Sequence, residues 1–188
     1  MRRSTLFLAV LTVLALLPGL GAFAATDHTG EAKLGAPYSW TGTTGTGVNL
    51  SSFTTSDDAV NPAGCAKDVQ NYCDTVLVAF TNPVPADATK PTLKETGVID
   101  LTAFTPVPGP ISDYDVHVYN SNAQGAKLAE TVPFATADAT NPDTPGASDE
   151  HIVFDVITTK TQPTNYYLLE VVYFTSVQGS YAGRASLI

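Results

Sequence analysis

The chain has 188 residues, of which 44% are hydrophobic and 14% charged, and its formal net charge is −9. Because such an acidic chain repels nucleic acid and anionic lipid, neither is expected as a partner. Its 13 prolines and 14 glycines break helices, and its many Thr and Val residues suit short strands.

The amino-terminal segment has the parts of a secretory signal peptide. Arg2 and Arg3 precede an apolar run from Leu6 to Leu17, and small residues stand before an expected cut ahead of Ala25. A membrane anchor is the alternative, but the run is shorter than the roughly 20 apolar residues that a span needs. We therefore expect residues 1–24 to be removed, and the mature protein to be secreted, extracellular and separate from the membrane.

Residues 25–35 are typical of a flexible leader, and residues 36–188 are expected to form one domain. Alternation and β-branched or aromatic content predict about eight strands, with a break near Gly97 in one of them. They are Pro37 to Gly42, Thr75 to Thr81, Leu93 to Phe104, Asp113 to Tyr119, Ala126 to Val132, His151 to Ile157, Tyr166 to Phe174, and Ser180 to Leu187. The predicted fold class is all-β: a jelly-roll-like β-sandwich of about eight antiparallel strands.

Two segments carry the clearest structural signals. The stretch Asn120 to Gly125 is rich in turn residues and predicts a hairpin turn between two strands. Tyr166 to Phe174 is apolar on both faces, as expected of a central, covered strand. Glu170 is its one polar interruption and needs a partner or an edge location. Trp40 is expected to be a core or rim anchor.

Cys65 and Cys73 are the only cysteines. In an oxidising compartment, an isolated pair is most simply a disulfide, and closing so short a loop would stabilise the fold by roughly 2 to 3 kcal/mol. A redox-active pair would need closer spacing, and a zinc site would need two more soft ligands. We expect the bridge to fix the loop before the next strand.

Acidic residues at strand entrances are candidate calcium ligands, because calcium prefers oxygen and secreted β-sandwiches often bind it at loop ends. Asp113 and Asp115 stand at one entrance, and Asp149 and Glu150 at another. Further candidate oxygens lie around the predicted disulfide loop, at Asp57, Asp58, Asp68 and Asp74. The alternative is that Asp113 and Asp115 accept hydrogen bonds from loop amides and cap a turn.

Three histidines are the candidates for imidazole chemistry. His28 falls in the predicted leader and is expected to be solvated. His117 shares a strand face with Asp113 and Asp115, but same-face positions stand almost 7 Å apart, which disfavours a shared metal ion. His151 follows two acids at the start of a strand.

No catalytic signature of a serine hydrolase or zinc protease occurs in the sequence. A small secreted hydrolase built on His117 or His151 with a nearby carboxylate stays as an alternative, because a triad is assembled in space. A third alternative is an inhibitor or adhesin that uses its proline-rich loops.

Several short motifs occur in the same order as in a known bacterial module. They are Trp40-Thr41-Gly42, Cys73-Asp74-Thr75-Val76, the Asp113 to Tyr119 strand with its Asn/Gly turn, Ser148-Asp149-Glu150, and Tyr166-Tyr167 leading to Gly179-Ser180-Tyr181. In these the chain resembles the pre-peptidase C-terminal domain of exported bacterial proteins. The resemblance implies a non-catalytic jelly-roll-like β-sandwich. Some relatives bind calcium or extracellular polymers such as collagen. Members usually follow a peptidase domain, and we expect none before the module here.

Overall fold

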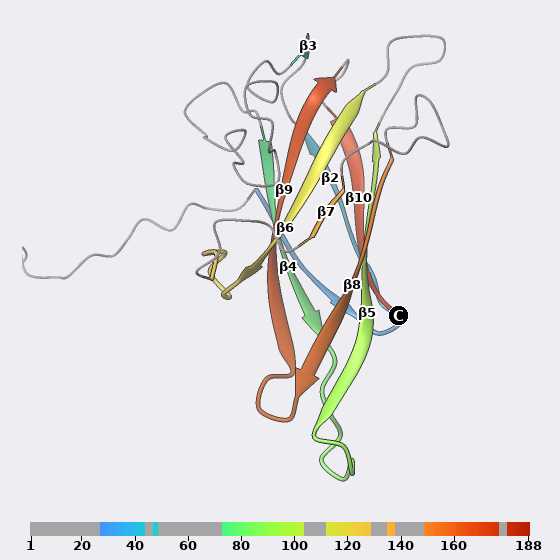
Figure 1. The fold of residues 1–188 in the computed structure, drawn as a ribbon, viewed down its shortest axis with the longest axis vertical. Coiled ribbons are helices and arrows are strands. Elements are labelled where there is room, and N and C mark those ends of the chain that lie inside the picture. Colours follow the sequence, from blue (N-terminus) through green and yellow to red (C-terminus); the bar gives the residue numbers. More distant parts are fainter. Residues whose placement is uncertain are drawn as a thin grey trace, which may run out of the picture.

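The computed structural model describes residues 27–43, 47–48, 73–103, 112–128, 135–137, 149–176 and 180–188. The predicted signal peptide and Cys65 lie outside these residues. Within them the chain is all-β, which confirms the predicted fold class (Figure 1). No helix in the described part of the chain could cross a membrane.

Ten strands are seen in the described residues, against the eight that were predicted. They are β1 (His28–Lys33), β2 (Tyr38–Thr43), β3 (Gly47–Val48), β4 (Cys73–Thr81), β5 (Thr92–Ala103), β6 (Asp113–Ser121), β7 (Ala135–Ala137), β8 (Glu150–Thr159), β9 (Thr164–Ser176) and β10 (Ser180–Leu187). The predicted strands match β2, β4, β5, β6, β8, β9 and β10. The one predicted over Ala126 to Val132 is described only as far as residue 128, where Lys127 makes an isolated bridge to Ser121.

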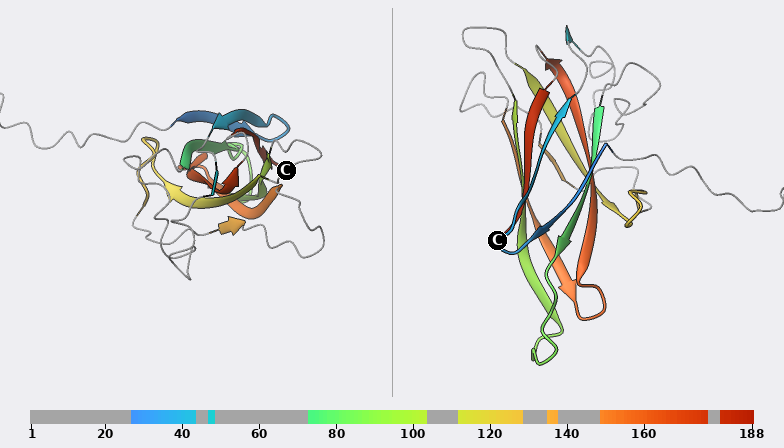
Figure 2. Two further views of the ribbon diagram at one scale, coloured as in Figure 1. Left: turned by 90° about the horizontal axis from the view of Figure 1, so that it is seen from above. Right: turned by 180° about the vertical axis from the view of Figure 1, so that it is seen from behind.

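The strands form two sheets. The six-stranded sheet has the order β1-β4-β9-β6-β7, with β3 added to β9, and the four-stranded sheet has the order β2-β10-β5-β8. All pairings between the described strands are antiparallel except β1 with β4, which is parallel. Seen end-on in Figure 2, the strands of the two sheets surround a common interior.

That interior is one apolar core. On β4, Val76, Val78 and Phe80 point inward together, because residues two apart share a face of a strand. The ring of Phe80 meets that of Phe154, from the opposite sheet, edge-on with centroids 5.6 Å apart. Side chains from both sheets therefore fill the same core. Trp40 belongs to it and is 6% exposed.

The first strand corrects the predicted flexible leader. Residues 28–33 form β1 and pair in register with residues 76–81 of β4. The sequence of β1 alternates little in hydrophobicity, so its own pattern does not specify a strand. Pairing with a strongly apolar neighbour supplies the hydrogen bonds, and Ala32 enters the core.

The predicted break near Gly97 is absent, and β5 runs through it. A side chain at Gly97 would collide with the ring of Phe154, its cross-strand partner, so the aromatic ring covers the glycine. The predicted hairpin turn is present after β6. The side-chain oxygen of Asn122 accepts hydrogen bonds from the backbone of Gln124 and Ala126, and Gly125 has a φ of 79°.

Candidate functional site

A carboxylate buried between the two sheets is the most unusual polar group in the described part of the chain. Asp74 follows Cys73 on β4 and takes the same inward phase as Val76 and Phe80. It is only 3% exposed. A buried carboxylate is costly unless hydrogen bonds and charges compensate for its lost hydration, so its partners decide what it can do.

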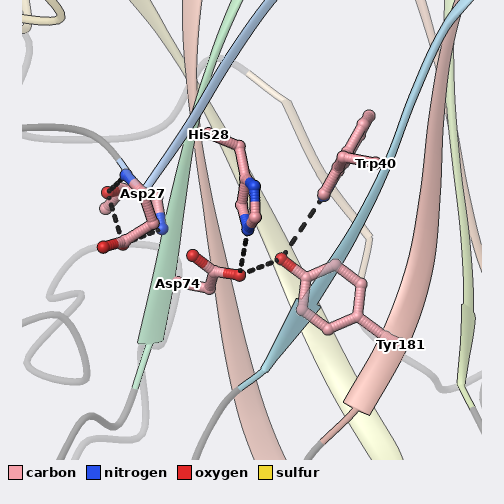
Figure 3. Close-up of polar contacts among 6 residues, drawn as sticks. Asp27, His28, Trp40, Asp74 and Tyr181 are labelled. Atoms are coloured by element: carbon pink, nitrogen blue, oxygen red, sulfur yellow. Dashed lines mark hydrogen bonds and ion pairs between the residues drawn. The ribbon is translucent and has the colours of Figure 1, made fainter.

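Two side chains contact this carboxylate directly and a third is bonded to one of them, as Figure 3 shows. The hydroxyl of Tyr181 on β10 donates to Asp74 Oδ2 at 2.7 Å, and Trp40 Nε1 on β2 donates to Tyr181 Oη at 3.4 Å. From the other side, His28 Nε2 on β1 lies 3.1 Å from the same Oδ2. The network therefore connects the edge of one sheet to the edge of the other.

A second carboxylate holds the start of β1 in place. Asp27 Oδ2 accepts hydrogen bonds from the backbone N–H and the hydroxyl of Thr75, each at 2.9 Å. The backbone N–H of Asp27 donates to the carbonyl of Thr75, also at 2.9 Å. These bonds bring His28 beside Asp74.

Burial controls the ionisation of this cluster. Desolvation raises the pKa of Asp74, although the hydrogen bond from Tyr181 and the charge of His28 act in the opposite direction. Desolvation, and then the charge of Asp74, raise the pKa of Tyr181 far above its ordinary value. Tyr181 is thus a fixed hydrogen-bond donor, and Asp74 holds its proton more tightly than a solvated Asp does.

The backbone of β2 approaches this cluster closely. A Cβ at Gly42 would overlap with the carboxylate of Asp74 and the hydroxyl of Tyr181. Tyr181 is fully buried, and only His28, with 28% of its side chain exposed, reaches toward solvent. The cluster is therefore closed by packing, and its geometry suits the joining of two sheets.

The second group of polar side chains lies on the solvent side of the four-stranded sheet, which we call the open face. Here His151 Nδ1 on β8 lies 2.6 Å from Asp100 Oδ1 on β5, and Arg184 on β10 stands opposite Asp100 in register. Lys94 Nζ lies 2.8 Å from Asp155 Oδ2. Both ion pairs are well exposed, so each contributes little to stability.

The open face also exposes large apolar side chains. Val153 is 56% exposed and Ile157 is 54% exposed, and they alternate with His151 and Asp155 along β8. The open face therefore combines both signs of charge with apolar surface.

A third group lies on the outward side of the six-stranded sheet. Glu170, the polar interruption in β9, is 5% exposed and has the partner that the sequence requires, because Lys127 Nζ lies 2.6 Å from its Oε1. The same ammonium stands 3.5 Å above the ring of Tyr119. Desolvation, followed by the charge of Glu170, raises the pKa of Tyr119. His117 is the cross-strand partner of Glu170.

The predicted calcium ligands lie on different sheets. Asp113 and Asp115 belong to β6 of the six-stranded sheet, whereas Glu150 begins β8 of the four-stranded sheet and Asp149 directly precedes it. Asp149 is exposed and Glu150 is buried. In the ranges that are described, no three acidic, histidine or cysteine side chains form a group that could hold a metal ion. Calcium binding stays a prediction.

The disulfide also stays a prediction. Cys73 begins β4 and is 8% exposed, but its predicted partner Cys65 lies outside the described residues. The candidate calcium ligands Asp57, Asp58 and Asp68 lie outside them as well.

Sequence reasoning missed the cluster around Asp74. From the sequence, Asp74 is predicted only as a calcium ligand, and His28 is predicted to be solvated in a flexible leader. One signal was available: Asp74 shares the phase of Val76, Val78 and Phe80, so a lone acid occupies an inward position. The partners of that acid come from residues 28, 40 and 181, and no local pattern predicts such distant contacts.

Comparison with known proteins adds no family. No protein-family model matches the chain, and no curated protein is similar to it.

Proposed function

We propose that this protein is a non-catalytic, secreted β-sandwich module that binds an extracellular polymer or protein through the open face. The observation that carries the proposal is the mixture of exposed apolar and charged side chains on β8 and β5 of that face. Val153 and Ile157 remain more than half exposed, and the flanking ion pairs can exchange partners with a ligand at little cost. The resemblance to the pre-peptidase C-terminal domain supports the same role.

The buried cluster supports a structural role in place of catalysis. Asp74 carries the proton-transfer chemistry that an enzyme could use, yet Tyr181 and Trp40 are packed in the core and Gly42 covers the carboxylate. A catalytic acid must come within hydrogen-bond reach of a substrate. The contacts of Asp74 instead hold β1, β2, β4 and β10 together.

Binding can be tested by co-sedimentation with insoluble collagen, cellulose and chitin, together with a pull-down from culture medium. We expect one of these to retain the protein, and Ile157→Lys to weaken retention by about 10-fold because it places a charge in the apolar part of the open face. Leu128→Lys is the matched control, since Leu128 is 50% exposed and lies outside that sheet. Equal retention of the two variants would remove the open face as the binding site.

Secretion and the disulfide belong to the same proposal. The mature protein recovered from the medium should begin at Ala25. Its intact mass should rise by about 2 Da on reduction, because opening the bridge between Cys65 and Cys73 adds two hydrogens. A protein that keeps residues 1–24 would contradict cleavage of the signal peptide, and a mass unchanged by reduction would contradict the disulfide.

The calcium-stabilised form of the proposal has its own test. Binding to the folded state alone raises the melting temperature as ligand concentration rises. If Asp113 and Asp115, or Asp149 and Glu150, hold calcium with help from other oxygens, millimolar calcium should raise the melting temperature above that in chelator. Identical melting in calcium and chelator would remove this form.

One observation favours a second candidate, a small secreted hydrolase. Asp100 fixes Nδ1 of His151 at 2.6 Å, as a carboxylate does when it orients a general base. Nε2 would then face a substrate on the open face. Activity on an ester, peptide or glycan panel that His151→Ala abolishes would establish this candidate, and an unchanged rate in that variant would exclude it. His117→Ala tests the other predicted histidine in the same way.

A further inference from the structure

The outer edge of β8 is the starting point. β8 ends the four-stranded sheet and pairs with β5 on one side only, among the strands described. The carbonyl of Ile157 accepts a hydrogen bond from Asn165 Nδ2 at 2.7 Å, and the N–H of Thr159 donates to the carbonyl of Gln162 at 2.9 Å. Both groups therefore point away from β5.

The backbone N–H and C=O groups of every second residue of β8 point in this same direction. Residues two apart point their backbone groups to the same side of a strand, so those of His151, Val153 and Asp155 also face away from β5. In the described part of the chain, no strand pairs with that edge. The same three side chains are exposed on the open face. An edge that the described strands leave unpaired is a template for another strand.

We propose that a second copy of this chain pairs antiparallel with this edge, with a two-fold axis between the two Val153 residues. Each N–H and C=O of residues 151, 153 and 155 then meets the residue opposite. The axis places His151 of each copy opposite Asp155 of the other, on the same face. The two four-stranded sheets join into one continuous sheet.

Charge selects this register. It continues the polar contacts of each copy into a row in which basic and acidic side chains alternate, because Asp100 already contacts His151 and Lys94 already contacts Asp155. Opposite charges that stand directly across an antiparallel pair are favourable, and like charges are unfavourable.

The neighbouring registers lack this complementarity. An axis at residue 152 brings Asp155 opposite Asp149, and an axis at residue 151 brings His151 opposite His151 of the other copy. An axis at residue 154 pairs Asp155 with Val153, and an axis at residue 155 pairs Asp155 with Asp155 of the other copy. The hydrogen bond from Asn165 to Ile157 limits pairing beyond residue 155. The edge is self-complementary at one position, as a two-fold interface requires.

Sedimentation velocity of the purified protein over about 1 to 200 µM tests the dimer, because so small an interface is expected to give a micromolar dissociation constant. The wild type should shift from monomer to dimer across that range. Asp155→Arg and His151→Glu should each weaken dimerisation at least about 10-fold, since Asp155→Arg removes the carboxylate that faces each His151 and His151→Glu places carboxylates opposite each other twice. An equimolar mixture of the two variants should form dimers again, because the guanidinium introduced in one variant then faces the carboxylate introduced in the other.

The controls separate pairing from folding and from binding to a polymer. Asp87→Arg makes the same charge change at an exposed turn that contacts Lys160, beyond the paired residues 151–155, and should leave dimerisation intact. Val153→Lys, which sets two ammonium groups at the axis, should abolish it; circular dichroism checks that each variant is folded. A wild type that stays monomeric, or a mixture that stays monomeric while both variants are folded, would overturn the dimer. Neither result bears on polymer binding, which the retention assay measures.

Discussion

At the scale of single residues, Asp74 shows how a buried charge is made tolerable. Removing a carboxylate from water costs several kcal/mol unless hydrogen bonds replace its hydration. The donor from Tyr181 and the nearby imidazole of His28 compensate for part of that cost. Protonation offers a second route, and the raised pKa of Asp74 shows that burial favours it.

The hydroxyl of Tyr181 is a measurable part of this compensation. Tyr181→Phe removes the donor to Asp74 and leaves a buried carboxylate with one fewer partner. We expect the free energy of unfolding to fall by about 1 to 3 kcal/mol, measured by urea denaturation. Tyr166→Phe is the control, because Tyr166 is only partly buried, and it should change the free energy by a few tenths of a kcal/mol. Equal losses in the two variants would mean that the contact with Asp74 is energetically neutral.

The pH dependence of stability should carry the signature of Asp74. Its pKa is raised above the ordinary 3.8, so the folded state binds the proton more tightly than the unfolded chain. This contribution is present in full below pH 3.8 and is lost as pH rises through the folded-state pKa. Asp74→Asn cannot ionise, so its stability relative to wild type should increase with pH in that window.

Urea titrations of both proteins between about pH 3 and pH 6 measure this difference. The comparison cancels the contributions of the other carboxylates, which titrate in both proteins. A relative stability that is flat or falling across the window would show that the pKa of Asp74 is not raised.

At the scale of elements, close approach of β2 to its neighbours depends on a missing side chain. Gly42→Ala places a methyl group where Asp74 and Tyr181 meet, so β2 must move away from the opposite sheet. We expect a loss of about 2 to 3 kcal/mol in the free energy of unfolding. Thr41→Ala, on the exposed face of the same strand, should cost much less. If both variants unfold at the same urea concentration, the sheets are free to shift at this point.

The strands that sequence patterns predicted are those whose own side chains specify them. β8 alternates buried and exposed residues along its whole length, and β9 is apolar on both faces. β1 was not predicted, because HTGEAK carries no such alternation and becomes a strand by pairing with β4. The buried cluster was not predicted for a related reason. Its hydrogen-bonded partners lie up to 141 residues apart, and only the arrangement of strands brings them together.

At the scale of the whole molecule, the two sheets share one core. This apolar core contains Val76 and Leu169 from the six-stranded sheet and Ile99 and Leu187 from the four-stranded sheet. Separating the sheets would expose both halves of that core to water. Neither sheet is expected to remain folded without the other.

The single tryptophan allows this expectation to be tested. Trp40 lies on β2 of the four-stranded sheet, stacks on Tyr38 with ring centroids 5.5 Å apart, and contacts Tyr181. Its fluorescence reports loss of packing at one edge of the molecule, whereas far-ultraviolet circular dichroism reports both sheets. Because the core is shared, the two signals should give the same urea midpoint and the same slope, as a cooperative transition requires. Exposure of Trp40 at a lower urea concentration than that at which the sheets unfold would contradict this expectation. In that case β1 and β2 would be a separate, weaker unit that is held mainly by the Asp74 cluster. Gly42→Ala would then shift only the midpoint measured by fluorescence.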